Sequence, residues 1–172
     1  MSQLPADDPA IRLFLRHALA TLAYRAGKAV RGTDDGFADF RAPQPDPQWK
    51  SNSPREILAH MGDLMDWVLS QLQGSPQWHN SPPLPWTDEI ARFFAALTAV
   101  DQHLASGRPI AYEPGKMFQG GIADALTHTG QLTMLRRLSG HKMKGESYAQ
   151  ADIEIGRTTL EQTPANAKYE FD

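Results

Sequence analysis

The chain has 172 residues, of which 41% are hydrophobic and 22% charged, and its formal net charge is −3. This composition is typical of an ordinary globular domain and excludes an intrinsically disordered chain. The absence of cysteine excludes disulfides, thiolate metal sites and cysteine nucleophiles. We therefore expect residues 1–172 to form a single domain.

The distribution of charge and hydrophobicity also restricts location and partners. The basic residues do not form the stripe that binding to a phosphate backbone needs, so we expect no nucleic-acid partner. The first residues have neither the basic region nor the apolar stretch of an export signal, and the apolar runs are too short to cross a bilayer. These patterns predict a cytoplasmic protein without a membrane partner.

The first helix is predicted over about residues 8–31. Asp8 is a suitable N-cap, and Pro9 follows at the first helical position, where its missing N–H removes no helical hydrogen bond. Hydrophobic residues then recur at the spacing of one helical face: Ile11, Phe14, Leu15, Ala18 and Leu22. A proline-rich loop follows over about residues 32–52.

The second helix, over about residues 53–73, has the clearest start signal in the chain. Ser53 and Glu56 have the spacing of a capping box, in which each side chain accepts a hydrogen bond from the backbone of the other. Gly74 is placed to end the helix, because glycine tolerates the left-handed conformation that follows many helices.

Two further helices are predicted over about residues 87–106 and 120–139, the latter beginning after a pair of glycines. Residues 140–172 show no helical period and are expected to form an irregular tail, in which residues 151–156 alternate like a short extended segment. Four helices around one apolar core predict an all-α four-helix bundle with long loops. The long first and second connections leave room for a crossover topology.

The fourth predicted helix carries the best candidate for a functional site. Asp124 and His128 are four residues apart, so their side chains lie on the same face and can bind one metal ion between them. His60, at the edge of the apolar face of the second helix, is the best candidate for a third ligand. Two histidines and one carboxylate form the open ligand set of catalytic zinc and non-haem iron sites.

The same residues also allow structural roles. An aspartate and a histidine at this spacing are often a hydrogen-bonded couple without a metal. Gln131, on the same face, could hydrogen-bond a ligand residue or a bound water, or it could join two helices.

The remaining polar and aromatic residues have weaker signals. Asp63 and Asp66 are expected to be solvated on the polar side of the second helix. Four histidines are expected to have surface roles: His17, His79, His103 and His141. Three tryptophans could line a pocket near a metal but are as a rule core residues: Trp67, Trp78 and Trp86.

Two segments resemble the metal-binding segments of the DinB-like (YfiT-type) metalloenzymes. Residues 122–140 are similar to the last helix of that family, which has the pattern His-x-x-x-His-x-Gly-Gln. Residues 56–64 are similar to the second-helix motif that supplies the first ligand. By position, His60 and His128 match family ligands, whereas Asp124 stands where the usual pattern has histidine.

The resemblance implies a DinB/YfiT-like bundle, often a homodimer, that binds zinc or nickel, with iron or manganese as alternatives. Family members include S-transferases that join low-molecular-weight thiols to electrophiles, so the implied activity is a metal-dependent transferase acting on a small-molecule substrate. The same ligands would support metal-assisted hydrolysis. Since the chain has no cysteine, a thiol would have to be a cofactor.

A non-catalytic protein is the alternative. Asp124 in place of histidine is also consistent with a small-molecule-binding or stress-associated helical module whose metal site has degenerated.

Overall fold

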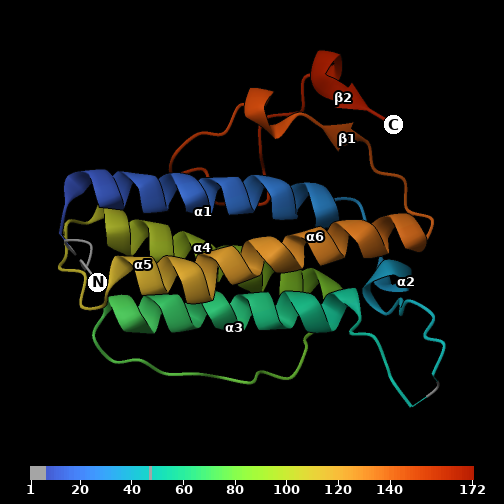
Figure 1. Ribbon diagram of the computed structural model, residues 1–172, viewed down its shortest axis with the longest axis horizontal. Coiled ribbons are helices and arrows are strands. Elements are labelled where there is room, and N and C mark those ends of the chain that lie inside the picture. Colours follow the sequence, from blue (N-terminus) through green and yellow to red (C-terminus); the bar gives the residue numbers. More distant parts are fainter. Residues whose placement is uncertain (1–6, 47) are drawn as a thin grey trace.

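The computed structural model describes residues 7–46 and 48–172, which are mostly helical (Figure 1). The prediction of four main helices packed together is confirmed. These are α1 (Pro9–Val30), α3 (Pro54–Leu72), α4 (Trp86–Ala105) and α6 (Ala123–Leu138). Two short helices are α2 (Asp35–Ala38) and α5 (Pro114–Met117). In the described part of the chain, no helix is both long and apolar enough to cross a membrane.

The predicted helix boundaries follow from local hydrogen bonds. The Asp8 carboxylate accepts from the backbone N–H of Ala10 at 2.7 Å and caps α1. At the start of α3, Ser53 Oγ accepts from Glu56 N at 3.3 Å, and Glu56 Oε2 accepts from Ser53 N at 2.8 Å, which confirms the capping box. Gly74 follows α3 with a φ of 77°, the left-handed conformation that ends the helix.

The helices form a ring in which α1 packs against α4 and α6, and α3 packs against the same two helices. Helices α1 and α6 run in one direction, and α3 and α4 run in the other (Figure 1). This is a crossover topology. Because α3 and α4 are parallel, the connection formed by residues 73–85 must return along the length of α3.

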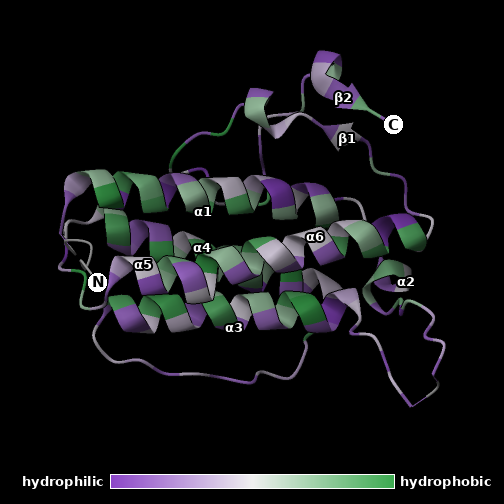
Figure 2. Cartoon of the chain, viewed as in Figure 1, coloured by the Kyte–Doolittle hydropathy of each residue, from purple (hydrophilic) through white to green (hydrophobic). Residues whose placement is uncertain are grey.

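The core lies between these four helices, and their hydrophobic residues alternate with hydrophilic ones along each ribbon (Figure 2). Its fully buried side chains include Leu19, Leu58, Met65, Phe93 and Leu97. The prediction that Phe14 belongs to the buried face of α1 was wrong. Phe14 is 59% exposed and contacts Phe118 at a ring-centroid distance of 6.0 Å, because α1 turns the neighbouring Leu15 into the core instead.

The prediction that the fourth helix begins after Gly120 and Gly121 is confirmed, since α6 starts at Ala123. The sequence did not reveal that the glycines themselves lie in a helical turn. Helix α5 continues through a π-helical turn, Phe118–Ile122, directly into α6. A β-carbon at Gly121 would clash with Cγ2 of Val68, and one at Gly120 would lie 3.3 Å from the ring of Trp67. The two glycines therefore allow the backbone of this turn to approach α3 closely.

The tail crosses the outside of α1 (Figure 1). Its strands β1 (Gly145–Glu146) and β2 (Glu170–Phe171) pair antiparallel, and its 3₁₀ turns cover Tyr148–Gln150 and Ala167–Tyr169. Residues 151–156 form no strand, and half-buried and exposed residues alternate along them.

Candidate metal centre

The packing of α3 against α6 brings His60, Asp124 and His128 together. One donor atom from each residue lies within 4.8 Å of the donor atoms of the other two. The distance from His60 Nε2 to Asp124 Oδ2 is 3.7 Å, and that from His128 Nε2 to Asp124 Oδ1 is 3.5 Å. Within the described residues, this is the one group of three or more His, Cys, Asp or Glu with such a spacing.

The geometry of this triad fits a divalent metal ion. Donor atoms bound tetrahedrally at the usual zinc–ligand distances lie about 3.4 Å from one another. The distances of 3.7 and 3.5 Å, each to a different oxygen of the Asp124 carboxylate, are near this value, and one donor atom from each residue lies within 4.8 Å of the others. Two imidazoles and one carboxylate are also a donor set that suits zinc, nickel and iron and leaves coordination positions open.

The same distances disfavour the hydrogen-bonded couple that the spacing of Asp124 and His128 also allowed. Protein hydrogen bonds have donor–acceptor distances of about 2.7–3.2 Å. The two Asp124–histidine contacts are longer, and neither is a hydrogen bond. Their spacing suits donors around a shared ion, and it also suits an ion pair between the carboxylate and a protonated histidine.

The triad is open to solvent. The side chains of His60 and Asp124 are 38% and 43% exposed, whereas that of His128 is 19% exposed. The two imidazole rings are nearly perpendicular, with an interplanar angle of 88° and a centroid distance of 4.8 Å. An ion and a small molecule can therefore reach the triad from outside.

Gln131 contacts the triad through His128. Its Oε1 atom lies 2.9 Å from His128 Nδ1, one turn along α6. If Nδ1 carries the proton and its N–H donates a hydrogen bond to this oxygen, Nε2 keeps a free lone pair on the side of Asp124 and can bind a metal ion. Gln131 is exposed and its hydrogen bond stays within α6, so it orients a histidine and does not join two helices.

Of the three tryptophans, Trp78 lies beside the triad, and Trp67 contacts Trp78. The ring centroid of Trp78 is 5.7 Å from that of His60 and 6.2 Å from that of Trp67. Trp86 is instead buried against Phe37. The sequence could not separate the three, because the path of residues 73–85 depends on the parallel packing of α3 and α4.

The expectation that Asp63 is solvated was wrong. Asp63 is buried and pairs with Arg92, which also lies 3.3 Å from Asp66 and 3.2 Å from Glu89. Burial raises the pKa of Asp63, but hydrogen bonds from Ser81 and the Arg92 guanidinium outweigh it, so the pKa lies below its usual value. Arg92 comes from α4, so periodicity within α3 alone could not reveal this partner.

The other histidines lie away from the triad. His17 and His79 are exposed, as expected for surface residues. His103 is buried in α4, which contradicts its predicted surface role, because its side of α4 faces the core. His141 Nε2 lies 3.3 Å from the carboxylate of Asp34.

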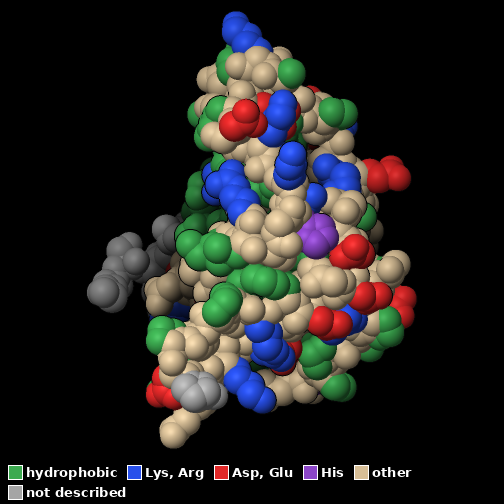
Figure 3. Space-filling view, turned by 90° about the vertical axis from the view of Figure 1, so that its right-hand side faces the viewer, with side chains coloured by type: hydrophobic (Ala, Val, Ile, Leu, Met, Phe, Trp, Pro, Cys, Tyr) green, Lys and Arg blue, Asp and Glu red, His purple; other side chains and the backbone are tan. Residues whose placement is uncertain are grey.

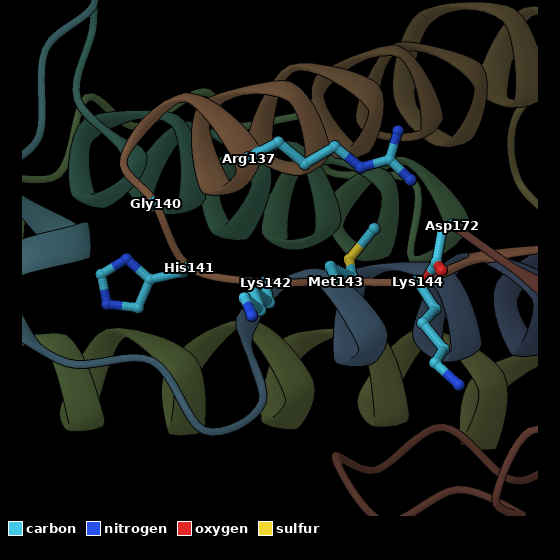
Figure 4. A pocket seen from close by; sticks show the side chains of 7 residues that line it. All are labelled: Arg137, Gly140, His141, Lys142, Met143, Lys144 and Asp172. Atoms are coloured by element: carbon cyan, nitrogen blue, oxygen red, sulfur yellow. The ribbon is translucent and has the colours of Figure 1, made fainter.

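A separate pocket of about 660 Å³ lies beyond the end of α6 (Figure 4). Arg137, Lys142 and Lys144 surround Met143 there, and Lys and Arg side chains gather on this end of the molecule (Figure 3). Arg137 is nine residues after His128, which corresponds to about 13 Å along a helix. No triad residue lines this pocket, so it is not part of the candidate centre.

Comparisons of the chain with protein-family models, curated proteins and solved structures give no match. The candidate centre therefore rests on the geometry of His60, Asp124 and His128.

Proposed function

We propose that the protein binds one divalent metal ion, zinc or nickel, through His60, Asp124 and His128. The observation that carries this proposal is the convergence of three donor atoms from two helices within 4.8 Å. The orientation of His128 by Gln131 supports it, because metal-binding histidines as a rule donate their second N–H to a fixed acceptor.

We further propose a metal-dependent transferase of the DinB-like type, which joins a low-molecular-weight thiol to an electrophilic small molecule. The resemblance of residues 56–64 and 122–140 to that family supports this activity. When bound, a divalent ion supplies Lewis-acid chemistry that makes a coordinated thiol or water ionise near neutral pH. The proposal also includes a cytoplasmic homodimer, as the resemblance implies.

In the proposed reaction, a carbon–sulfur bond forms between the thiol and the electrophile. The bond to the leaving group breaks, the leaving group departs with its electron pair, and the thiol proton passes to solvent. The chain supplies no thiol of its own, so the thiol is a second substrate. His60, Asp124 and His128 hold the ion, and the exposure of His60 and Asp124 gives both substrates access to it from solvent.

Asp124 changes the electrostatics relative to a three-histidine site. A carboxylate cancels one of the two charges of a divalent ion and is a harder ligand than imidazole. We therefore expect Asp124→His to keep metal binding but to shift the preference towards softer ions. Competition between zinc and manganese measures this shift, and an unchanged preference would contradict a role of Asp124 as a ligand.

The activity is tested by conjugation of several small thiols to 1-chloro-2,4-dinitrobenzene, followed by absorbance, with protein loaded with zinc or nickel. We expect turnover that falls to background in His60→Ala and in His128→Ala, but not in His17→Ala, which alters an exposed histidine on α1. Metal-loaded protein whose turnover does not depend on His60 would contradict the proposed activity.

A non-catalytic binding protein is favoured by one observation. Within the described residues, the group of donor atoms contains no fourth carboxylate or histidine at this spacing, so no second acid–base side chain lies among the proposed ligands. If metal binding is found without any thiol conjugation or hydrolysis, this second function replaces the first.

A further inference from the structure

The connection between α3 and α4 holds Trp78 in a fixed place. On one side of it, Gln77 N donates to Ser70 Oγ at 2.9 Å. On the other side, Ser81 N donates to the buried carboxylate of Asp63 at 2.9 Å. The segment that carries Trp78 is therefore tied to α3 on both sides, although it has no regular secondary structure.

The indole N–H of Trp78 has its partner within the same segment, since it donates to Asn80 Oδ1 at 3.0 Å. The ring therefore needs no other polar partner, and the side chain is nevertheless 44% exposed. A large aromatic side chain held in a half-exposed position leaves apolar surface that another group can cover.

Trp67 extends this aromatic surface. Its ring is nearly perpendicular to that of Trp78, at an interplanar angle of 84°. The ring of Trp67 is backed by Gly120, where an added β-carbon would lie only 3.3 Å away. The glycine thus makes room for Trp67 next to the π-helical turn that leads to Asp124.

Trp67 and Trp78 form an aromatic wall on the His60 side of the triad. Trp78 is the part of this wall that contacts His60, with an interplanar angle of 64° between the two rings. A molecule whose polar end reaches the three donor atoms would place its next group against this wall.

The net charge of the metal-loaded triad decides which kind of chemical group can bind against the aromatic wall. A divalent ion held by one carboxylate leaves the site with a net positive charge, which disfavours a cationic neighbour. A neutral aromatic ring gains from stacking or edge contacts with tryptophan, which are worth about 0.5–1.5 kcal/mol beyond burial of area. A positively charged group would gain from the same rings only if no metal were present.

We propose that Trp78, supported by Trp67, determines specificity by binding an aromatic group of the molecule that binds at the triad. This inference rests on the proposed function, since it requires the metal ion. It assigns the substrate class as small electrophiles or thiols that carry a planar aromatic ring.

The test compares two ligands with the same metal-binding group. Benzohydroxamate has a phenyl ring where acetohydroxamate has a methyl group, and titration calorimetry gives the affinity of each for the zinc-loaded protein. We expect the ratio of the two affinities to fall about three- to tenfold in Trp78→Ala. Trp78→Phe should restore most of the ratio, and Trp49→Ala, which alters an exposed tryptophan in the other proline-rich loop, should leave it unchanged.

Four results would overturn the proposal, and they differ in their consequence for the metal site. An unchanged ratio in Trp78→Ala, with zinc content and thermal unfolding like those of the wild type, would remove the aromatic wall and leave the metal site. Tighter binding of phenyltrimethylammonium to metal-free protein than of benzohydroxamate to zinc-loaded protein would assign the wall to cations. Failure of both hydroxamates to bind protein that contains zinc would remove the wall and leave the metal site, whereas protein that takes up no zinc would remove the proposed metal function together with the wall.

Discussion

The orientation of His128 depends on a single hydrogen bond to Gln131. The acceptor Oε1 lies 2.9 Å from Nδ1, and this contact is the one polar constraint on the ring besides Asp124 in the described part of the chain. Removing such an acceptor lowers metal affinity by about 10- to 100-fold in known sites.

We therefore expect Gln131→Ala to weaken metal binding by about 10- to 100-fold, without loss of stability, because Gln131 is exposed. Gln131→Glu, which keeps an acceptor oxygen, should retain most of the affinity. Competition with a fluorescent zinc chelator measures the change, and Gln102→Ala, at an exposed glutamine of α4, is the control. Equal affinities for Gln131→Ala and wild type would show that His128 needs no support.

Sequence reasoning at this scale succeeded where all contacts lie within one helix. Asp124, His128 and Gln131 share a face because of helical periodicity alone, and the structure places them accordingly. His60 could be chosen because it lies at the edge of the apolar face of α3. Trp78 could not, because its neighbours are set by the path of a connection that has no period.

At the scale of elements, the π-helical turn before α6 sets where Asp124 lies relative to α3. It approaches α3 so closely that a β-carbon at Gly121 would clash with the side chain of Val68. Gly130 in α6 is a natural comparison, since an added β-carbon there would meet no atom within 4 Å.

Substitution by alanine should therefore change the free energy of unfolding in opposite directions at Gly121 and at Gly130. Gly121→Ala is expected to lower the free energy of unfolding by about 1–3 kcal/mol through overpacking. Gly130→Ala is expected to raise it by up to about 1 kcal/mol, because alanine favours the helix. Chemical denaturation measures both. A combined Gly121→Ala/Val68→Ala variant should be less destabilised than the sum of the two single variants, because Val68→Ala removes the clashing Cγ2 atom. A strictly additive loss would mean that the strain at Gly121 lies elsewhere.

The pairing of α3 with α4 includes the buried ion pair of Asp63 with Arg92. The pKa of Asp63 is lower in the folded chain than its ordinary value of 3.8, so folding favours the ionised form. The unfolded chain then binds the proton more tightly, and the stabilisation is present above pH 3.8 and lost as the pH falls through the lowered pKa.

We expect Asp63→Asn to lower the free energy of unfolding at neutral pH by about 2 kcal/mol, since it leaves the partly buried Arg92 with fewer charged partners. Its stability should also fall less steeply below pH 4 than that of the wild type. Denaturation curves between about pH 2 and 7 give both quantities. Asp152→Asn, at an exposed aspartate of the tail, should behave like the wild type, and an equally steep fall in Asp63→Asn would contradict the assignment.

For the whole molecule, the tail is joined to the bundle by a buried carboxylate. Glu146 accepts from Tyr24 O–H and from Lys28 Nζ, both at 2.6 Å, and its side chain is 1% exposed. Lys28 also pairs with Glu170 of β2 at 3.2 Å, so both strands of the tail are connected to α1.

Glu146→Ala should detach the start of the tail at a cost of about 3 kcal/mol, because it leaves the partly buried Lys28 with a single partner. Hydrogen exchange in residues 142–172 should accelerate while that of α3 and α6 stays slow. Glu161→Ala, at an exposed glutamate of the tail, is the control. Unchanged exchange in Glu146→Ala would show that the tail is held mainly by its other contacts.

The bundle could be predicted because helix starts and apolar faces are encoded locally, as the caps at Asp8 and Ser53 show. The tail could not, since Glu146 acquires its partners from α1, more than a hundred residues earlier. The π-helical turn at Gly120 and Gly121 could not be predicted for a similar reason. Glycine is typical of helix ends, but here the neighbouring helix requires it.

The central claim is that His60, Asp124 and His128 bind one divalent metal ion. Elemental analysis of purified untagged protein, compared with a His60→Ala/His128→Ala variant of unchanged helical content, tests it most directly. We predict about one zinc or nickel ion per chain in the wild type and none in the variant. Wild-type protein that remains free of metal after reloading with divalent ions, or a variant that keeps its metal, would contradict the claim.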